Sequence, residues 1–230
     1  MKASQTKRAA FGVVVAVSMH ACGGAAAPRQ GAPPPAARSS EALAELEALY
    51  RARADSALNR FTEADVQFMA GMIGHHAQAL VMSSLAPTHG ASASVQTLSA
   101  RTINAQQDEI ATMQGWLADR GQPVPEFRIS GTSLVIDGPG HDMASMPGML
   151  TPEQMRELDA ARGSEFDRLF LTYMIQHHSG AVTMVHELFA TDGAALGDTV
   201  FKVASDIQVD QASEIDRMER MLEALPNEGR

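Results

Sequence analysis

The chain has 230 residues, is poor in aromatic residues and rich in alanine and methionine, and carries a formal net charge of −9. This length allows one domain with a sizeable core, or two small domains. The first 21 residues hold three basic residues and no acid, so the remainder has 15 basic and 27 acidic residues and a charge of −12. Such an acidic body argues against nucleic acid and anionic membrane surfaces as partners and is compatible with attracting cations.

Residues 1–21 have the pattern of an export signal, since basic residues precede an apolar run, Ala9 to Val17, that is too short to span a bilayer as a helix. The only cysteine, Cys22, follows directly and resembles the lipidated residue of a bacterial lipoprotein, although Met19 stands where an aliphatic residue is expected. Lipidation at Cys22 and ordinary cleavage nearby both stay open. Either outcome predicts an exported protein of the periplasm or cell envelope. The only membrane contact that the sequence indicates is a lipid anchor at Cys22.

Residues 22–39 are rich in alanine, glycine, proline and arginine and predict a flexible tether. Ser40 can cap an additional N-terminal helix over residues 40–60. Residues 61–120 then predict a pair of helices. The first helix opens at Thr62 with Asp65 and is ended by Pro87, and the second covers about residues 94–118.

A long crossover over residues 121–163 separates this pair from a second one over residues 164–225. Its first part contains four prolines and is expected to be irregular, and Thr151 then caps a short helix. The second pair consists of a helix over about residues 165–190 and a final helix capped by Asp198.

The two helix pairs are repeats of one another. Their first helices match at an offset of 102 residues, and in both a methionine precedes a His-His pair by three residues inside a wide apolar face. Their second helices match at an offset of 105, which aligns Gln106 with Gln211 and Met113 with Met218. Two such pairs can bury their apolar faces only against each other. The sequence therefore predicts an all-α fold, a four-helix bundle with the long crossover typical of ferritin-like proteins, plus the N-terminal helix.

A more specific similarity extends over residues 61–225. The sequence Met-Pro-Gly-Met at residues 146–149, a short helix, Gly163, Phe166-Asp167 and the second His-His motif together resemble the bacterial family catalogued as domain of unknown function 305. The resemblance implies a ferritin-like four-helix bundle. It also implies copper binding, because some members of that family are periplasmic copper-binding proteins, although many have no assigned role.

The repeated motif has the chemistry of a soft metal site. Thioether sulfur and imidazole nitrogen together suit Cu(I), suit Cu(II) less well, and do not suit zinc, calcium or magnesium. On a helix, each motif methionine lies beside both histidines that follow it. A further candidate cluster, His141 and Met143 followed by Met146 and Met149, lies in the crossover. The predicted copper ligands are Met72, His75, His76, Met82, Met113, Met174, His177, His178, Met184, Met218, His141 and Met143.

A structural explanation of the same residues stays open. Buried methionine is ordinarily core filler, and a buried histidine is ordinarily just hydrogen-bonded, with Gln106 and Gln211 as suitable partners. If a metal is bound, each ligating imidazole needs an acceptor for its other ring N–H. The acceptors within reach are Gln106, Asp108, Glu109, Asp210, Gln211 and Glu214.

Enzyme activity is not expected. The di-iron oxidases of this fold need a glutamate three residues before a histidine, and the residues at those positions in the motif helices are not acidic. No organic cofactor is indicated, because the chain has no glycine-rich phosphate loop and no Cys-x-x-Cys motif. The sequence predicts an exported protein that buffers, sequesters or hands on copper, with the ion and a copper-accepting protein as partners. The alternative is a structural or interaction lipoprotein that binds no metal. The oligomeric state stays open.

Overall fold

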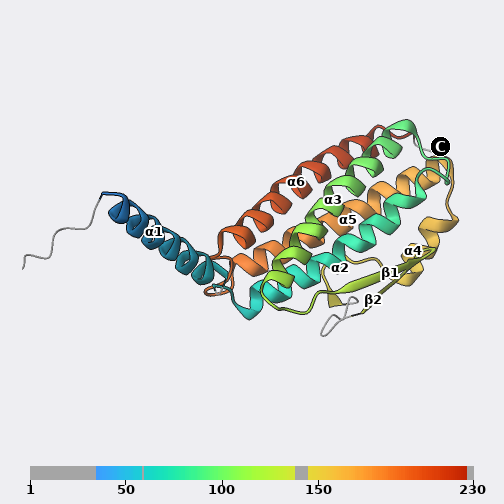
Figure 1. Cartoon of the computed structure of the whole chain (residues 1–230). Coiled ribbons are helices and arrows are strands. Elements are labelled where there is room, and N and C mark those ends of the chain that lie inside the picture. Colours follow the sequence, from blue (N-terminus) through green and yellow to red (C-terminus); the bar gives the residue numbers. More distant parts are fainter. Residues whose placement is uncertain (1–34, 59, 138–144, 227–230) are drawn as a thin grey trace, which may run out of the picture. The chain divides into compact units, whose positions relative to one another are not determined.

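A computed structural model of the chain describes residues 35–58, 60–137 and 145–226 (Figure 1). These ranges contain six helices and one two-stranded sheet, so the protein is mostly helical as predicted. The predicted signal peptide, Cys22, His141 and Met143 lie outside the described residues. None of the helices in these ranges combines the length and the hydrophobicity that crossing a membrane requires.

The N-terminal helix starts earlier than predicted. Helix α1 spans Pro35–Leu58 and so begins at Pro35 instead of Ser40, within the stretch predicted to be a tether. Proline is well tolerated in the first turn of a helix, where its missing N–H would have had no intrahelical partner, and the alanines that follow it favour helix.

The first helix pair begins as predicted. Helix α2 spans Glu63–Leu85, and Thr62 and Asp65 form a capping box in which each side chain accepts a hydrogen bond from the other residue's backbone N–H. Helix α3 spans Ala93–Asp119 and is capped by the Ser92 side chain.

The second helix pair repeats this arrangement with different caps. Helix α5 spans Gly163–Phe189 and helix α6 spans Asp198–Glu223. The N-cap of α6 is Gly197, so the prediction that Asp198 caps this helix is wrong. Asp198 is instead the first helical residue, where its carboxylate interacts favourably with the helix dipole.

The crossover contains a β-hairpin that the sequence analysis did not predict. Strand β1, Glu126–Ser130, pairs antiparallel with strand β2, Ser133–Asp137, through a two-residue turn. Gly131 has a φ of +59° in this turn, a conformation that a tight hairpin requires and that glycine adopts without strain. The short helix α4, Pro152–Ala160, follows under the predicted Thr151 cap.

Four long helices make up the body of the molecule. α2 packs on α3, α5 packs on α6, and α2 and α5 join the two pairs (Figure 1). The hairpin and α4 also contact α2, which is why almost every side chain between Phe68 and Ser83 is buried. The hairpin lies so close that a Cβ added at Gly74 would stand 2.6 Å from Ile136 Cδ1.

Two buried aspartates at equivalent positions of the repeat brace one pair against the other. Asp65 at the start of α2 accepts a hydrogen bond from the backbone N–H of Ala195, in the loop between α5 and α6 (2.7 Å). Asp167 near the start of α5 accepts from the N–H of Ser92, the cap of α3 (3.1 Å). Each pair thus holds the inter-helix loop of the other.

The buried apolar side chains form two clusters. In each of α3, α5 and α6, one end of the helix belongs to one cluster and the other end to the second cluster. Buried polar residues lie between the two ends, and we call them the polar layer. The polar layer consists of His75, His76, Gln106, His177, His178 and Gln211.

Candidate metal centre

The repeated His-His motif brings four imidazoles into the middle of the helical body. α2 supplies His75 and His76, α5 supplies His177 and His178, and none of the four is more than 1% exposed. The rings of His75 and His177 are the closest, with centroids 3.9 Å apart. The structure therefore brings together the four histidines that the sequence analysis grouped.

Two of these histidines are bonded to backbone carbonyl groups. His75 Nε2 lies 3.0 Å from the carbonyl oxygen of Pro147, and His177 Nε2 lies 3.0 Å from that of His75. A carbonyl oxygen can only accept, so both Nε2 atoms carry the hydrogen and donate it. Each neutral ring then has its free lone pair on Nδ1.

The other two histidines are bonded to carboxylates. His76 Nε2 donates to Glu109 Oε2 on α3 (2.7 Å), and His178 Nε2 donates to Glu214 Oε2 on α6 (2.6 Å). Glu109 and Glu214 are 105 residues apart, the offset at which these helices repeat. The repeat has therefore placed the same histidine–carboxylate pair twice.

The Nδ1 atoms of all four histidines are buried and lack a hydrogen-bond partner. Leaving a buried polar atom unpaired costs about 1–3 kcal/mol, and native proteins rarely do so without a reason. The polar layer contains four such atoms, each with an available lone pair. Each of them is therefore a candidate nitrogen ligand for a cation.

Burial keeps two of the rings neutral. Removal from water lowers the pKa of His75 to about 3, and the neighbouring His76 and His178 lower it further than the Pro147 carbonyl can raise it. Burial likewise lowers the pKa of His177 well below its ordinary value, with His75, His178 and His76 adding to the effect. A neutral ring is the form that binds a metal.

The predicted methionine ligands lie on both sides of the polar layer. Met72 and Met113 belong to one apolar cluster, and Met82, Met174 and Met218 belong to the other, all of them fully buried. The remaining one, Met184, is only partly buried and packs at the edge of the first cluster.

Carboxylates and imidazoles do not form a complete site by themselves. Among the residues that the structure describes, no three His, Cys, Asp or Glu side chains converge to hold a metal ion. A site in the polar layer would therefore draw on thioether sulfur as well as on Nδ1. That ligand set fits Cu(I) and does not fit hard divalent ions.

The glutamines of the polar layer differ from their predicted role. Gln106 and Gln211 were expected to hydrogen-bond the imidazoles if no metal is bound, but the acceptors are the two glutamates and two backbone carbonyls. Gln106 has no partner at either side-chain atom, and Gln211 has none at Oε1. Of the acceptors considered from sequence, the structure selects Glu109 and Glu214.

The crossover supplies a backbone hydrogen-bond acceptor to the polar layer, and residue patterns in the sequence do not reveal it. The segment 145–150 lies across α2 and α5 and presents the Pro147 carbonyl to His75. Gln78 on α2 holds the end of this segment, because its side chain accepts from the Leu150 N–H and donates to the Leu150 carbonyl. The repeat gives no hint of this contact, since the position equivalent to Gln78 is Gly180.

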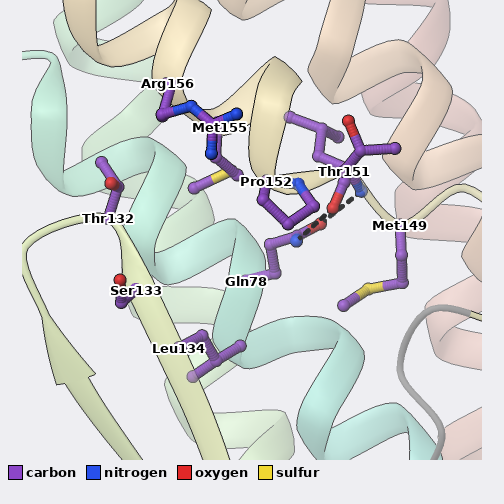
Figure 2. Close-up of a pocket in the computed structure, with 10 residues that line it drawn as sticks. Gln78, Thr132, Ser133, Leu134, Met149, Thr151, Pro152, Met155 and Arg156 are labelled. Carbon is purple, nitrogen blue, oxygen red and sulfur yellow. Dashed lines mark hydrogen bonds between the residues drawn. The ribbon is translucent and has the colours of Figure 1, made fainter.

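Met146 and Met149 of the crossover do not line the same hollow. Met149 lines a hollow beneath α4 together with Gln78 and Met155 (Figure 2). Met146 lines a different hollow, beside Met184 and the N-terminal half of α2. The two methionines thus line separate hollows, and their segment lies over the polar layer.

Similar folds are known from solved structures. A DUF305 fragment from Deinococcus radiodurans is 30% identical, with a TM-score of 0.59, and the match covers 72% of this chain and 99% of that one. A DUF305 protein from Streptomyces coelicolor, predicted to be secreted, is 26% identical, with a TM-score of 0.59 and coverage of 73% and 96%.

A third similar protein, CopM, has been solved with metals bound. Its Cu(II)-bound form is 27% identical to this chain, with a TM-score of 0.53, and the match covers 69% of this chain and 95% of CopM. Its Cu(I)-bound and silver-bound forms match at 25% identity and a TM-score of 0.51.

The family follows from the sequence as well as from the fold. No curated protein matches the chain. The profile of the domain of unknown function DUF305 matches residues 65–222, which include α3, the crossover, α5 and nearly all of α2 and α6. With both repeats inside that match, the chain belongs to the DUF305 family.

Proposed function

We propose that this protein is an exported copper-binding protein, and that its four long helices form a ferritin-like four-helix bundle whose polar layer holds the ion. The observation that carries the proposal is the set of four buried Nδ1 atoms without partners. In each ring the Nε2–H is already donated to a protein acceptor, so the orientation and tautomer needed for ligation through Nδ1 are set in advance.

The likeness to CopM supports a soft ion. CopM binds Cu(I), Cu(II) and silver, as the names of its structures state. In this chain, the methionines one turn before each His-His pair add sulfur to the available ligands, and sulfur favours Cu(I) over Cu(II). We propose Met72 and Met174 as ligands beside the four histidines. Met82, Met113, Met184 and Met218 are further candidates, as are His141 and Met143 of the crossover.

The role that follows is binding and not catalysis. A site built from buried imidazoles and thioethers suits buffering, sequestration or delivery to a copper-accepting protein. The relative from Streptomyces coelicolor that is predicted to be secreted supports export, and Cys22 is the proposed lipid attachment site for a protein of the periplasm or cell envelope.

A second candidate function is a metal-free structural or interaction lipoprotein. One observation favours it: every imidazole of the polar layer already has a protein partner at Nε2. Such rings could persist as hydrogen-bonded core residues.

Competition against a Cu(I) chelator separates the two functions. The purified protein is expected to take Cu(I) from the chelator and to prefer Cu(I) and Ag(I) to Zn(II). A variant with His75, His76, His177 and His178 all changed to Gln should lose the tightest site while circular dichroism shows the same helix content. Equal Cu(I) binding by the variant and the wild type would refute the proposed site. Absence of binding by the wild type would favour the metal-free function.

A further inference from the structure

A groove between α3 and α6 leads from solvent to the polar layer. It has a volume of about 430 Å³, and both Gln106 and Gln211 contribute to its wall. The two carboxylates that accept from His76 and His178 line the same groove, and they are 20% and 25% exposed. The groove therefore joins water to two fully buried histidines through one carboxylate each.

The glutamines in this wall are unsatisfied. Gln106 is only 2% exposed and has no partner at Oε1 or Nε2, and Gln211 is 4% exposed and has none at Oε1. Two buried amide oxygens thus line one groove without donors, and amide oxygens are among the groups that can coordinate a cation. Their positions are equivalent in the repeat, so the groove has one such oxygen from each pair of helices.

Three carboxylates, those of Glu109, Asp210 and Glu214, line the same wall. Partial burial raises the pKa of Asp210, and the nearby carboxylates of Glu109, Asp206 and Glu214 raise it further. These acids therefore lie close enough to repel one another, and a cation in the groove would relieve the repulsion.

Three arginines also line the groove, namely Arg101, Arg217 and Arg220. Arg101 and Arg220 are exposed, so solvent screens their charges and their long side chains can move aside. Glu109 and Glu214 are held in place by their bonds to the histidines. Arg217 is half-buried, and the carboxylates of Glu109 and Glu214 are the charges that hydrogen bonds to the polar layer hold in place.

We propose that the groove between α3 and α6 is the access route of the copper ion to the polar layer. Gln106, Gln211, Glu109 and Glu214 supply oxygens that hold the ion briefly outside His76 and His178. The inference rests on the proposed function and adds to it the path that the ion takes. Since no three carboxylates or histidines converge there, the groove acts as a transient station and not as the final site.

The hollow that contains Met146 and Met184 is the competing route. It lies beside the N-terminal half of α2, and Gln67, Gln122 and prolines also line it. None of the side chains that line it hydrogen-bonds a histidine of the polar layer, in contrast to the groove between α3 and α6.

Bulky substitutions at the surface test the route. Ala105 and Ser213 are exposed residues of the groove wall. Neither residue supplies a hydrogen-bond partner of the four histidines, so Ala105→Phe with Ser213→Phe narrows the groove without removing such a partner. Gln67→Phe is the matched control in the competing hollow. Stopped-flow mixing of the purified protein with Ag(I) follows quenching of the single tryptophan, Trp116, which belongs to the same apolar cluster as Met72 and Met113.

Narrowing the access route should change the rates at which the ion binds and dissociates, but not the Kd. The double variant is expected to slow both association and dissociation about tenfold, which corresponds to about 1.4 kcal/mol in each barrier, with the Kd unchanged. Gln67→Phe should leave both rates as in the wild type. Unchanged rates in the double variant, or slowing only in the control, would overturn the route while leaving the proposed function intact. Absence of Ag(I) binding by the wild type would overturn both.

Discussion

A neutral imidazole has one N–H and one lone pair, and hydrogen bonding decides which nitrogen carries which. In the polar layer, Pro147, His75, Glu109 and Glu214 each accept an Nε2–H, so the four lone pairs stand on Nδ1. The same atoms are buried without partners. At each position, the residue that accepts the Nε2–H thus determines that Nδ1 is the nitrogen free to bind a metal.

The role of the motif methionines can be tested without disturbing the core. Met72→Leu with Met174→Leu keeps volume and apolarity and should change the free energy of unfolding by less than about 1.5 kcal/mol. If the thioethers are ligands, Cu(I) affinity measured by chelator competition should nevertheless fall. Met69→Leu is the matched control, because Met69 is equally buried on α2 but lies about two turns from the histidines. Equal loss in the control would show that packing, and not ligation, is responsible.

The depressed pKa values make a prediction about stability. An unfolded histidine takes up a proton near pH 6.5, whereas His75 in the folded protein does so only near pH 3, and His177 is lowered in the same direction. The metal-free protein should therefore be fully stabilised by these groups above pH 6.5. As pH falls below 6.5, each histidine should lower the free energy of unfolding by about 1.4 kcal/mol per pH unit.

Urea unfolding at a series of pH values between 7 and 4 measures this slope. The variant His75→Gln with His177→Gln retains the other titrating groups, so the difference between its slope and that of the wild type isolates the two histidines. Parallel slopes would mean that both rings take up protons over the same pH range in the folded protein as in the unfolded chain.

At the scale of single elements, the crossover breaks the symmetry of the repeat. Segment 145–150 packs on α5 so closely that a Cβ at Gly180 would stand 2.0 Å from the Pro147 carbonyl oxygen. Gln176 donates a hydrogen bond to the Gly148 carbonyl at the same place. The position of the Pro147 carbonyl, and with it the tautomer of His75, therefore depends on a glycine in α5.

Gly180→Ala tests this dependence. The added methyl group should push the segment off α5, lower the free energy of unfolding by about 1–3 kcal/mol and weaken Cu(I) binding, because His75 loses its acceptor. Gly115→Ala on α3 is the control, since a Cβ there meets nothing within 4 Å and should stabilise the helix by up to about 1 kcal/mol. Thermal unfolding and chelator competition on both variants provide the comparison. Wild-type affinity in Gly180→Ala would separate the segment from the site.

Features with local causes could be predicted from the sequence. The starts of α2 and α4 follow from Thr62 and Thr151, whose caps are set by residues three positions away. Grouping of the four histidines follows from the helical period and the repeat. The hairpin at residues 126–137 was missed because its pattern is short and its turn is a single glycine-threonine pair. The acceptor for His75 was missed because it is a backbone atom, placed by tertiary contact and not by residue type.

At the scale of the molecule, the two helix pairs enclose a polar layer between two apolar clusters. Cross-bracing by Asp65 and Asp167 holds the pairs together at a distance from that layer. The unpaired atoms of the layer lower the stability of the metal-free protein, so an ion that satisfies them should raise it.

Loading should accordingly be visible in thermal unfolding. Ag(I) is expected to raise the Tm of the wild type. Once the site is full, the rise in Tm should grow with the logarithm of the ratio of the free Ag(I) concentration to the Kd. The variant with all four histidines changed to Gln should show no such rise. An equal rise in both proteins would place the bound ion elsewhere.

The most direct test of the polar layer as a metal site observes the imidazole nitrogens themselves. Long-range ¹H–¹⁵N NMR of the protein, labelled at histidine, distinguishes protonated from free ring nitrogens before and after one equivalent of Ag(I). We predict that the four histidines of the layer carry their hydrogen on Nε2 without metal, that the Nδ1 resonances of those that bind the ion shift on loading, and that the Nε2–H is kept. Nδ1 resonances that do not move when Ag(I) binds, or rings protonated at Nδ1 in the metal-free protein, would contradict the account.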